Sequence, residues 1–169
     1  MKTQVTTVCD LEKELPPDAP DAPKWLVKAL QVPREEGFIE SQGCDVHYFR
    51  WGNPENPPLI LMHGFLAHAR CMAFIAPFLA ENYHVVAYDL TGMGDSGVRD
   101  AYPDSVRAQE VVDVAQKTGL FEHAQKPIVI AHSYGGHVGL TAMNEHHALL
   151  GGLIICDLMV LRIERLKER

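Results

Sequence analysis

Residues 128–136 read Ile-Val-Ile-Ala-His-Ser-Tyr-Gly-Gly, and this stretch decides the fold. An apolar strand runs into a small-x-Ser-x-Gly turn, and the turn leads straight into a helix. Such a turn is so sharp that large side chains at positions 131 and 135 would collide with neighbouring backbone, which suits Ala131 and Gly135. It would raise the Ser133 hydroxyl above the sheet at a helix N-terminus, where developing negative charge is stabilised. The alternative is a serine that caps an ordinary helix.

Two further motifs follow predicted strands. Residues 61–66 read LMHGFL, and we expect His63 to brace this loop through backbone hydrogen bonds rather than to act as a base. Residues 88–97 read YDLTGMGDSG and contain GxGxxG, which alone suggests a dinucleotide site. Pro103 prevents a helix from following directly, and the next strand does not end in a ribose-binding acid. The dinucleotide interpretation is therefore disfavoured.

The order of the predicted elements indicates an α/β fold. A hairpin of residues 38–41 and 46–51 feeds the strands 59–62, 84–89, 127–131 and 153–156. Helices are predicted at 25–30, at 71–80 with a kink at Pro77, at 104–118 and at 134–147. Asp104 or Ser105 should cap the third of these helices, and Gly119 should end it. Alternating buried strands and helices predict a three-layer α/β/α sandwich with a mostly parallel sheet.

Composition narrows the class of protein. The chain has 169 residues, 47% of them apolar, and a net charge of -7, which argues against binding to nucleic acid or to an anionic membrane. Its four cysteines have no CxxC spacing, so no zinc site or disulfide framework is expected. Neither a signal peptide nor a membrane-spanning run is apparent. We therefore expect a cytoplasmic protein without a metal or other cofactor.

Three motifs in order, HGF at 63–65, DLTGMGDSG at 89–97 and AHSYGG at 131–136, resemble the α/β-hydrolase superfamily over roughly residues 36–160. In this superfamily the residue at the sharp strand-to-helix turn, called the elbow, divides the chemistries. With serine at the elbow, the chain resembles esterases, lipases, lactonases, carbon-carbon bond hydrolases and perhydrolases, whereas haloalkane dehalogenases and epoxide hydrolases use Asp there. The resemblance implies that Ser133 is the nucleophile. It also implies that the backbone N–H groups of Phe65 and Tyr134 form the oxyanion hole.

The remaining catalytic groups of the family follow the nucleophile in the order acid, then histidine. All nine histidines precede residue 148, so the chain is expected to be truncated after the sixth strand, without the lid, the last strands and the catalytic histidine. Asp157 follows the strand 153–156 and is a candidate acid, although it could instead cap the next turn. His132 is expected to be buried scaffold. Residues 1–35 are interpreted as an N-terminal arm with a short helix, and residues 36–169 as the N-terminal part of the hydrolase domain.

Two functions follow from these residues. The first is a serine hydrolase that acts on an ester-like or other carbonyl-containing small molecule. The alternative is a catalytically inactive fragment that acts as a binding or interaction protein. The strand 153–156 should be a sheet edge with no Lys or Pro to discourage pairing. We therefore expect this edge to recruit a second copy of the chain or a complementing C-terminal chain.

Overall fold

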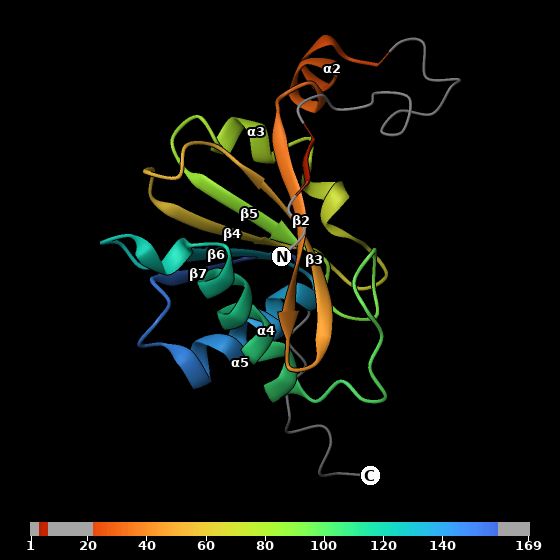
Figure 1. Cartoon of the computed structure of the whole chain (residues 1–169), viewed down its shortest axis with the longest axis vertical. Helices are drawn as coiled ribbons and strands as arrows, with labels where there is room; N and C mark the ends of the chain where they lie inside the picture. Colours follow the sequence, from red (N-terminus) through yellow and green to blue (C-terminus); the bar gives the residue numbers. More distant parts are fainter. Residues whose placement is uncertain (1–3, 7–21, 159–169) are drawn as a thin grey trace.

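The structure is a computed structural model that describes residues 4–6 and 22–158. Most of the predicted N-terminal arm, and the chain beyond residue 158, lie outside these residues. The described part forms the expected α/β/α sandwich, with helices on both faces of one sheet (Figure 1). Its elements in chain order are β1 (Gln4–Thr6), α2 (Lys24–Leu30), β2 (Arg34–Ser41), β3 (Cys44–Trp51), β4 (Pro58–Met62), η1 (Ala69–Met72), α3 (Ala76–Leu79), β5 (His84–Tyr88), α4 (Asp104–Lys117), η2 (Leu120–Glu122), β6 (Ile128–His132), α5 (Tyr134–His146) and β7 (Gly152–Cys156).

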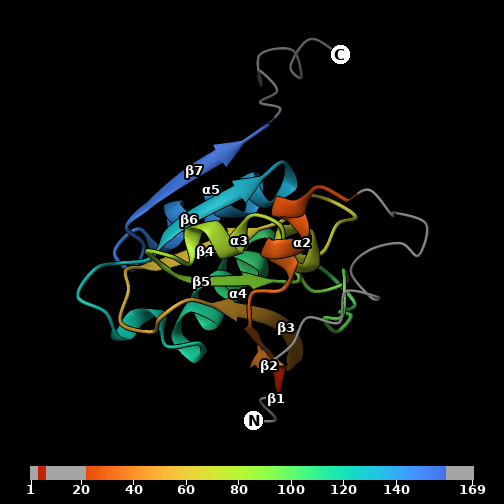
Figure 2. The same ribbon diagram turned by 90° about the horizontal axis from the view of Figure 1, so that it is seen from above.

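The sheet has the strand order β1-β2-β3-β5-β4-β6-β7. The strands β5, β4, β6 and β7 are parallel, and β3 pairs with β5 in the antiparallel sense. The predicted hairpin is present, because β2 and β3 are antiparallel and meet at Gln42 and Gly43, which both have positive φ. Seen from above, α2 and α3 lie over the sheet and β7 lies at one edge (Figure 2). The carboxyl ends of β4, β5 and β6 therefore share one edge, where ligands bind in open α/β sheets.

Two apolar layers hold the helices to the sheet. Ile60 and Met62 of β4 pack on the side of α4 and α5, whereas Leu59 and Leu61 pack with residues of α2, η1 and α3. This alternation follows from the two-residue period of a strand, and it lets one apolar run serve both faces of the sheet. The central strands β4 and β5 are buried at every position. They form a rigid base for the loops at their carboxyl ends.

Two local expectations about helices were wrong. Residues 71–80 do not form one kinked helix, because the chain makes the short turn η1 and then α3, which has Pro77 in its first turn. Within an α-helix, proline is tolerated in the first turn, because the N–H group that it lacks would have no partner in the helix there. The N-cap of α4 is Pro103, and neither Asp104 nor Ser105 caps the helix. Gly119 follows the helix with a φ of 83°, as predicted for a helix end.

No helix among residues 22–158 is long and apolar enough to cross a lipid bilayer.

Candidate active site

Ser133 occupies a strained turn between β6 and α5. Its φ of 49° and ψ of -115° lie outside the regions that non-glycine residues ordinarily adopt. Such a conformation costs about 1–3 kcal/mol and persists only where the surrounding structure imposes it. Here the Ser133 N–H donates to the Cys156 carbonyl at 2.9 Å, and the Ser133 carbonyl accepts from Gly136 N–H at 2.8 Å. The side chain makes no capping hydrogen bond to α5 in the described structure, so the ordinary helix-cap interpretation fails.

The turn fits closely against the end of β4. A Cβ atom added at Gly135 would lie 2.5 Å from the His63 carbonyl oxygen and 3.1 Å from the Met62 Cβ atom. On the other side, a Cβ atom added at Gly64 would lie 3.3 Å from the Ser133 Cβ atom. The close contact with the His63 backbone therefore explains why position 135 requires a small residue. The loop after β4 lies directly beside Ser133.

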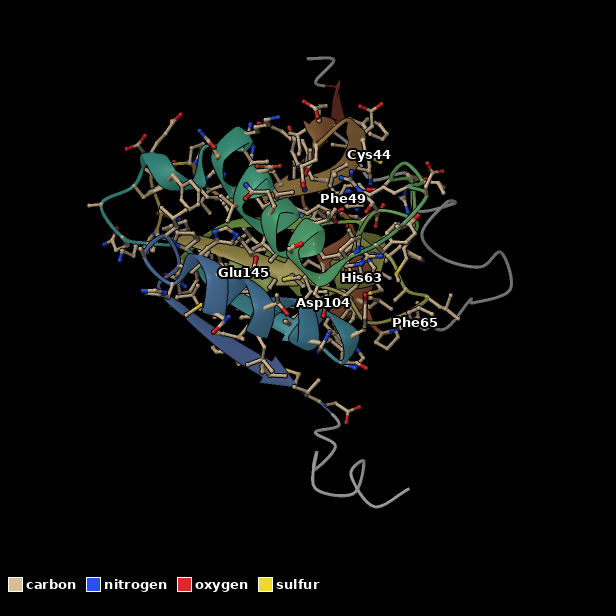
Figure 3. The ribbon with its side chains drawn as sticks, turned by 90° about the horizontal axis from the view of Figure 1, so that it is seen from below. Cys44, Phe49, His63, Phe65, Asp104 and Glu145 are labelled. Carbon is tan, nitrogen blue, oxygen red and sulfur yellow. The ribbon has the colours of Figure 1, made fainter. Side chains whose placement is uncertain are left out.

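His63 braces this loop, as expected from the sequence. Its side chain is buried, with Nδ1 2.7 Å from the Gly64 carbonyl oxygen, and Nε2 accepts from the Leu90 N–H at 3.1 Å. Since Nε2 accepts a hydrogen bond, the ring is neutral and Nδ1–H is the donor. Burial lowers the pKa of His63, which favours the same state. Figure 3 shows His63 set within the molecule and Phe65 nearer its periphery.

The two residues expected to supply the oxyanion hole lie side by side. The Phe65 side chain is 64% exposed, and its ring meets the Tyr134 ring edge-on at 5.8 Å. Tyr134 is the first residue of α5, so its N–H has no partner within the helix. The Arg107 guanidinium lies 5.5 Å from the Tyr134 ring centroid, and the His137 ring stacks on the same ring. This arrangement brings the Phe65 loop, Tyr134 and Ser133 to one edge of the sheet.

Asp157 directly follows β7, the strand next to the elbow. The parallel register pairs His132 with Cys156, so Asp157 follows β7 at the edge where Ser133 follows β6. Asp157 is exposed and has a φ of 59°. The expectation that His132 is buried was wrong, because its side chain is exposed. Burial alternates along the end of β6, with Ala131 turned inward and His132 turned outward.

A buried histidine-carboxylate network beside this loop had no signal in the sequence. His47 of β3 contacts Asp89 through Nδ1 at 2.8 Å and Glu36 through Nε2 at 3.1 Å. Burial alone would lower the pKa of His47, but its hydrogen bonds and charge interactions with Asp89 and Glu36 raise it. Burial alone would raise the pKa of Asp89, yet the hydrogen bonds from His47 and from the N–H groups of Ala69 and Asp95 lower it. The result is a buried ion pair at the end of β5.

The glycine-rich loop closes around Asp89. Gly94 has a φ of 54°, and a Cβ atom there would lie 2.3 Å from the Asp89 carboxyl carbon. The Asp95 N–H donates to the same carboxylate at 2.9 Å. The Asp95 amide therefore serves a carboxylate of the protein itself, and the N–H groups of Gly92, Met93, Ser96 and Gly97 donate to backbone carbonyls, which agrees with the disfavoured dinucleotide interpretation.

A metal at this network is disfavoured by the charge state of His47. Among the described residues, the one three-residue group with ligand atoms within 4.8 Å of one another is His47, Asp89 and Asp95. His47 directs both ring nitrogens at carboxylates, so a protonated ring has no lone pair for a metal. A cavity of about 320 Å³ lies beside the group and is lined by Phe49, His68, Arg70, Asp89, Gly94 and Asp95.

The described geometry is accompanied by clear similarity to known proteins. The model of the alpha/beta hydrolase family matches residues 59–167, which is more than half of the chain. The chain belongs to this family. It is 26% identical over 115 residues to the "Uncharacterized hydrolase YugF" of Bacillus subtilis, which covers 67% of this chain and 41% of the relative. It is 28% identical over 151 residues to a human "Serine hydrolase-like protein", and that alignment covers 86% of this chain and 68% of the human protein.

Solved structures of related proteins have the same fold as this alpha/beta hydrolase. The crystal structure of a membrane phospholipase A, described as a bacterial virulence factor, aligns with a TM-score of 0.69 and 29% identity. The alignment covers 76% of this chain and 41% of the phospholipase. The chain thus spans about two fifths of the length of the Bacillus relative and of this structure.

Proposed function

We propose that this alpha/beta hydrolase carries the nucleophile and oxyanion hole of a serine hydrolase that acts on an ester-like or other carbonyl-containing small molecule. The main support is the strained backbone of Ser133, with a φ of 49° between a buried strand and a helix. Strain of this kind is retained where it positions a reactive group. The 29% identity to a phospholipase A, named for ester hydrolysis, is consistent with that chemistry.

In this proposal the Ser133 Oγ atom attacks the carbonyl carbon of the substrate, and its proton passes to a base. The backbone N–H groups of Phe65 and Tyr134 stabilise the resulting oxyanion, and the N-terminus of α5 adds a favourable dipole. The leaving group departs with a proton, and an acyl group remains on Ser133. Water then attacks the acyl-enzyme, which releases the acid and restores the serine hydroxyl.

The base and the acid complete the proposed machinery. Three histidines follow Ser133, and they lie on or next to α5; His137 Nε2 is already 3.5 Å from Asp104 Oδ2. We therefore place the histidine base outside residues 1–169 or on another chain. Asp157 is the proposed acid, because it follows β7 at the edge that carries Ser133. Its carboxylate would orient the histidine and stabilise its charged form.

The wider setting is also part of the proposal. We propose a cytoplasmic protein in which residues 1–35 form an arm and residues 36–169 belong to the hydrolase domain. In the described part of the chain β7 is the outer strand, and Ile154 on it is 52% exposed. Unpaired backbone groups beside an apolar side chain favour addition of another strand. The proposed partner at this edge is a second copy or a complementing chain.

The proposed nucleophile is tested with an activated ester such as p-nitrophenyl acetate. The chain should show a slow acylation burst, because loss of one triad member costs on the order of 10⁴ to 10⁶ in turnover while the oxyanion hole still contributes. Ser133→Ala should abolish the burst, and Ser105→Ala, an exposed serine on α4, should preserve it. A burst that survives in Ser133→Ala would contradict the nucleophile. No burst in the unchanged chain would favour the non-catalytic binding function.

A further inference from the structure

A second pocket lies at the opposite end of the sheet from Ser133, where the parallel strands begin. Its volume is about 210 Å³. His84 is the first residue of β5, and His123 directly follows η2, in the connection that leads to β6. Figure 1 shows η2 away from the arrowheads of β4 and β5. The residues that line it include Arg50, Glu55, His84, Glu122 and His123.

Two imidazoles face each other in this pocket. His84 Nδ1 and His123 Nε2 are 3.4 Å apart, and the ring centroids are 5.7 Å apart. His84 is only 2% exposed, and its backbone N–H donates to the Pro57 carbonyl at 2.9 Å. His123 is partly exposed, so the pair can be reached from solvent.

The separation of the two nitrogens matches a pair of metal ligands. Hydrogen bonds from N–H groups in proteins are usually about 2.7–3.2 Å long, so 3.4 Å is long for a direct bond. Histidine nitrogens bind zinc at about 2.0–2.1 Å in tetrahedral geometry, which places two such ligands about 3.3–3.4 Å apart. An ion between the rings would therefore require little movement of either side chain.

The hydrogen bonding of His84 also allows it to bind a metal through Nδ1. Its Nε2 atom has no hydrogen-bond partner in the described part of the chain, so no second contact there fixes the tautomer. His47 differs, since both of its nitrogens face carboxylates.

The remaining charges of the pocket are compatible with a cation. Arg50 forms an ion pair with Glu35, which offsets its charge. Glu55 and Glu122 also line the pocket and contribute negative charge. Neither forms a compact three-residue ligand group with the imidazoles in the described structure, so water would complete the coordination.

We propose that His84 Nδ1 and His123 Nε2 bind a divalent transition-metal ion of the Zn²⁺ type, with water in the remaining positions. The ion would tie the connection after η2 to the start of β5, two segments that the chain separates by 39 residues. Because this geometry requires the folded chain, the metal should stabilise the fold by mass action. The site is independent of Ser133 and of the proposed hydrolase activity.

The test uses the untagged full chain, first stripped with a chelator. Zn²⁺ is titrated by calorimetry, and Co²⁺ is titrated by visible absorption, which reports tetrahedral nitrogen ligation. We expect one site per chain and an increase in melting temperature with Zn²⁺. His123→Ala should weaken binding about tenfold or more, because it removes one of two protein ligands. His147→Ala removes an exposed histidine outside the pocket and should leave binding unchanged.

Circular dichroism of His123→Ala checks that the fold is retained, and His123 is the better target because His84 is buried. Glu122→Gln should weaken binding less than His123→Ala does. Absence of Zn²⁺ and Co²⁺ binding in the unchanged chain would overturn the proposal. The contact between the two rings would then be a hydrogen bond. Equal binding by the unchanged chain and His123→Ala would overturn it as well.

Discussion

The contact between the elbow and β4 can be tested by adding one methyl group. In Gly135→Ala the new Cβ atom would lie 2.5 Å from the His63 carbonyl oxygen, which is nearly 1 Å inside ordinary contact. That oxygen belongs to the backbone at the end of a buried strand, so a side-chain rotation cannot relieve the clash. Overpacking of this kind costs about 1–3 kcal/mol. Alanine recovers at most about 1 kcal/mol over glycine in helix propensity. Taking the middle of the overpacking range, about 2 kcal/mol, we therefore expect a net loss of about 1–2 kcal/mol in the free energy of unfolding.

Urea denaturation measures this loss, and Gly152→Ala is the matched control. A Cβ atom at Gly152 meets nothing within 4 Å, so that variant should be within about 0.5 kcal/mol of the unchanged chain. The esterase burst of Gly135→Ala should also fall, because the displaced elbow no longer faces the loop that carries Phe65. If Gly135→Ala is as stable and as reactive as the unchanged chain, the close-packed elbow is refuted.

Three further outcomes follow from the structure. Ser133→Gly should raise the free energy of unfolding by about 1 kcal/mol while abolishing acylation, because glycine tolerates the φ of 49°; a less stable variant in urea denaturation would contradict the strain. Unfolded histidine titrates near 6.5, whereas the folded pKa of His84 is about 4, so stability should fall by up to about 3 kcal/mol as pH drops from 6.5 towards 4. The fall should be smaller in His84→Gln, and identical pH profiles of the two chains would argue against the buried neutral ring. Ile154→Lys on the edge strand β7 should reduce self-association in light scattering; a chain that is already a clean monomer would remove the proposed edge partner.

Local pattern was sufficient for the elements that form the sheet and its elbow. Apolar runs predicted β4, β5, β6 and β7, and the small residue at 135 predicted a close approach of neighbouring backbone, which the structure places at the end of β4. His63 was also interpreted correctly, because a histidine between a strand and a glycine has backbone groups within reach, and one of its two partners is the carbonyl of the adjacent Gly64. These features depend on neighbours in sequence or on the order of strands, and both can be derived from a single chain.

Long-range partners were beyond the sequence. His47 meets Asp89 across 42 residues, and His84 meets His123 across 39, so neither pair forms a motif. The helix errors have local causes instead. Pro103 precedes α4 where a capping side chain was expected, and Pro77 begins a new short helix rather than bending an existing one. His132 was misplaced because the last residue of a strand can face solvent even when the strand interior is buried.

The central claim is that Ser133 is the nucleophile, and covalent labelling tests it most directly. The full chain is incubated with a fluorophosphonate, digested and analysed by mass spectrometry. We expect slow labelling that maps to Ser133 alone and is absent from Ser133→Ala, because a serine without its base is a weak nucleophile held in reactive geometry. Modification of another serine, or equal labelling of Ser133→Ala, would contradict the account.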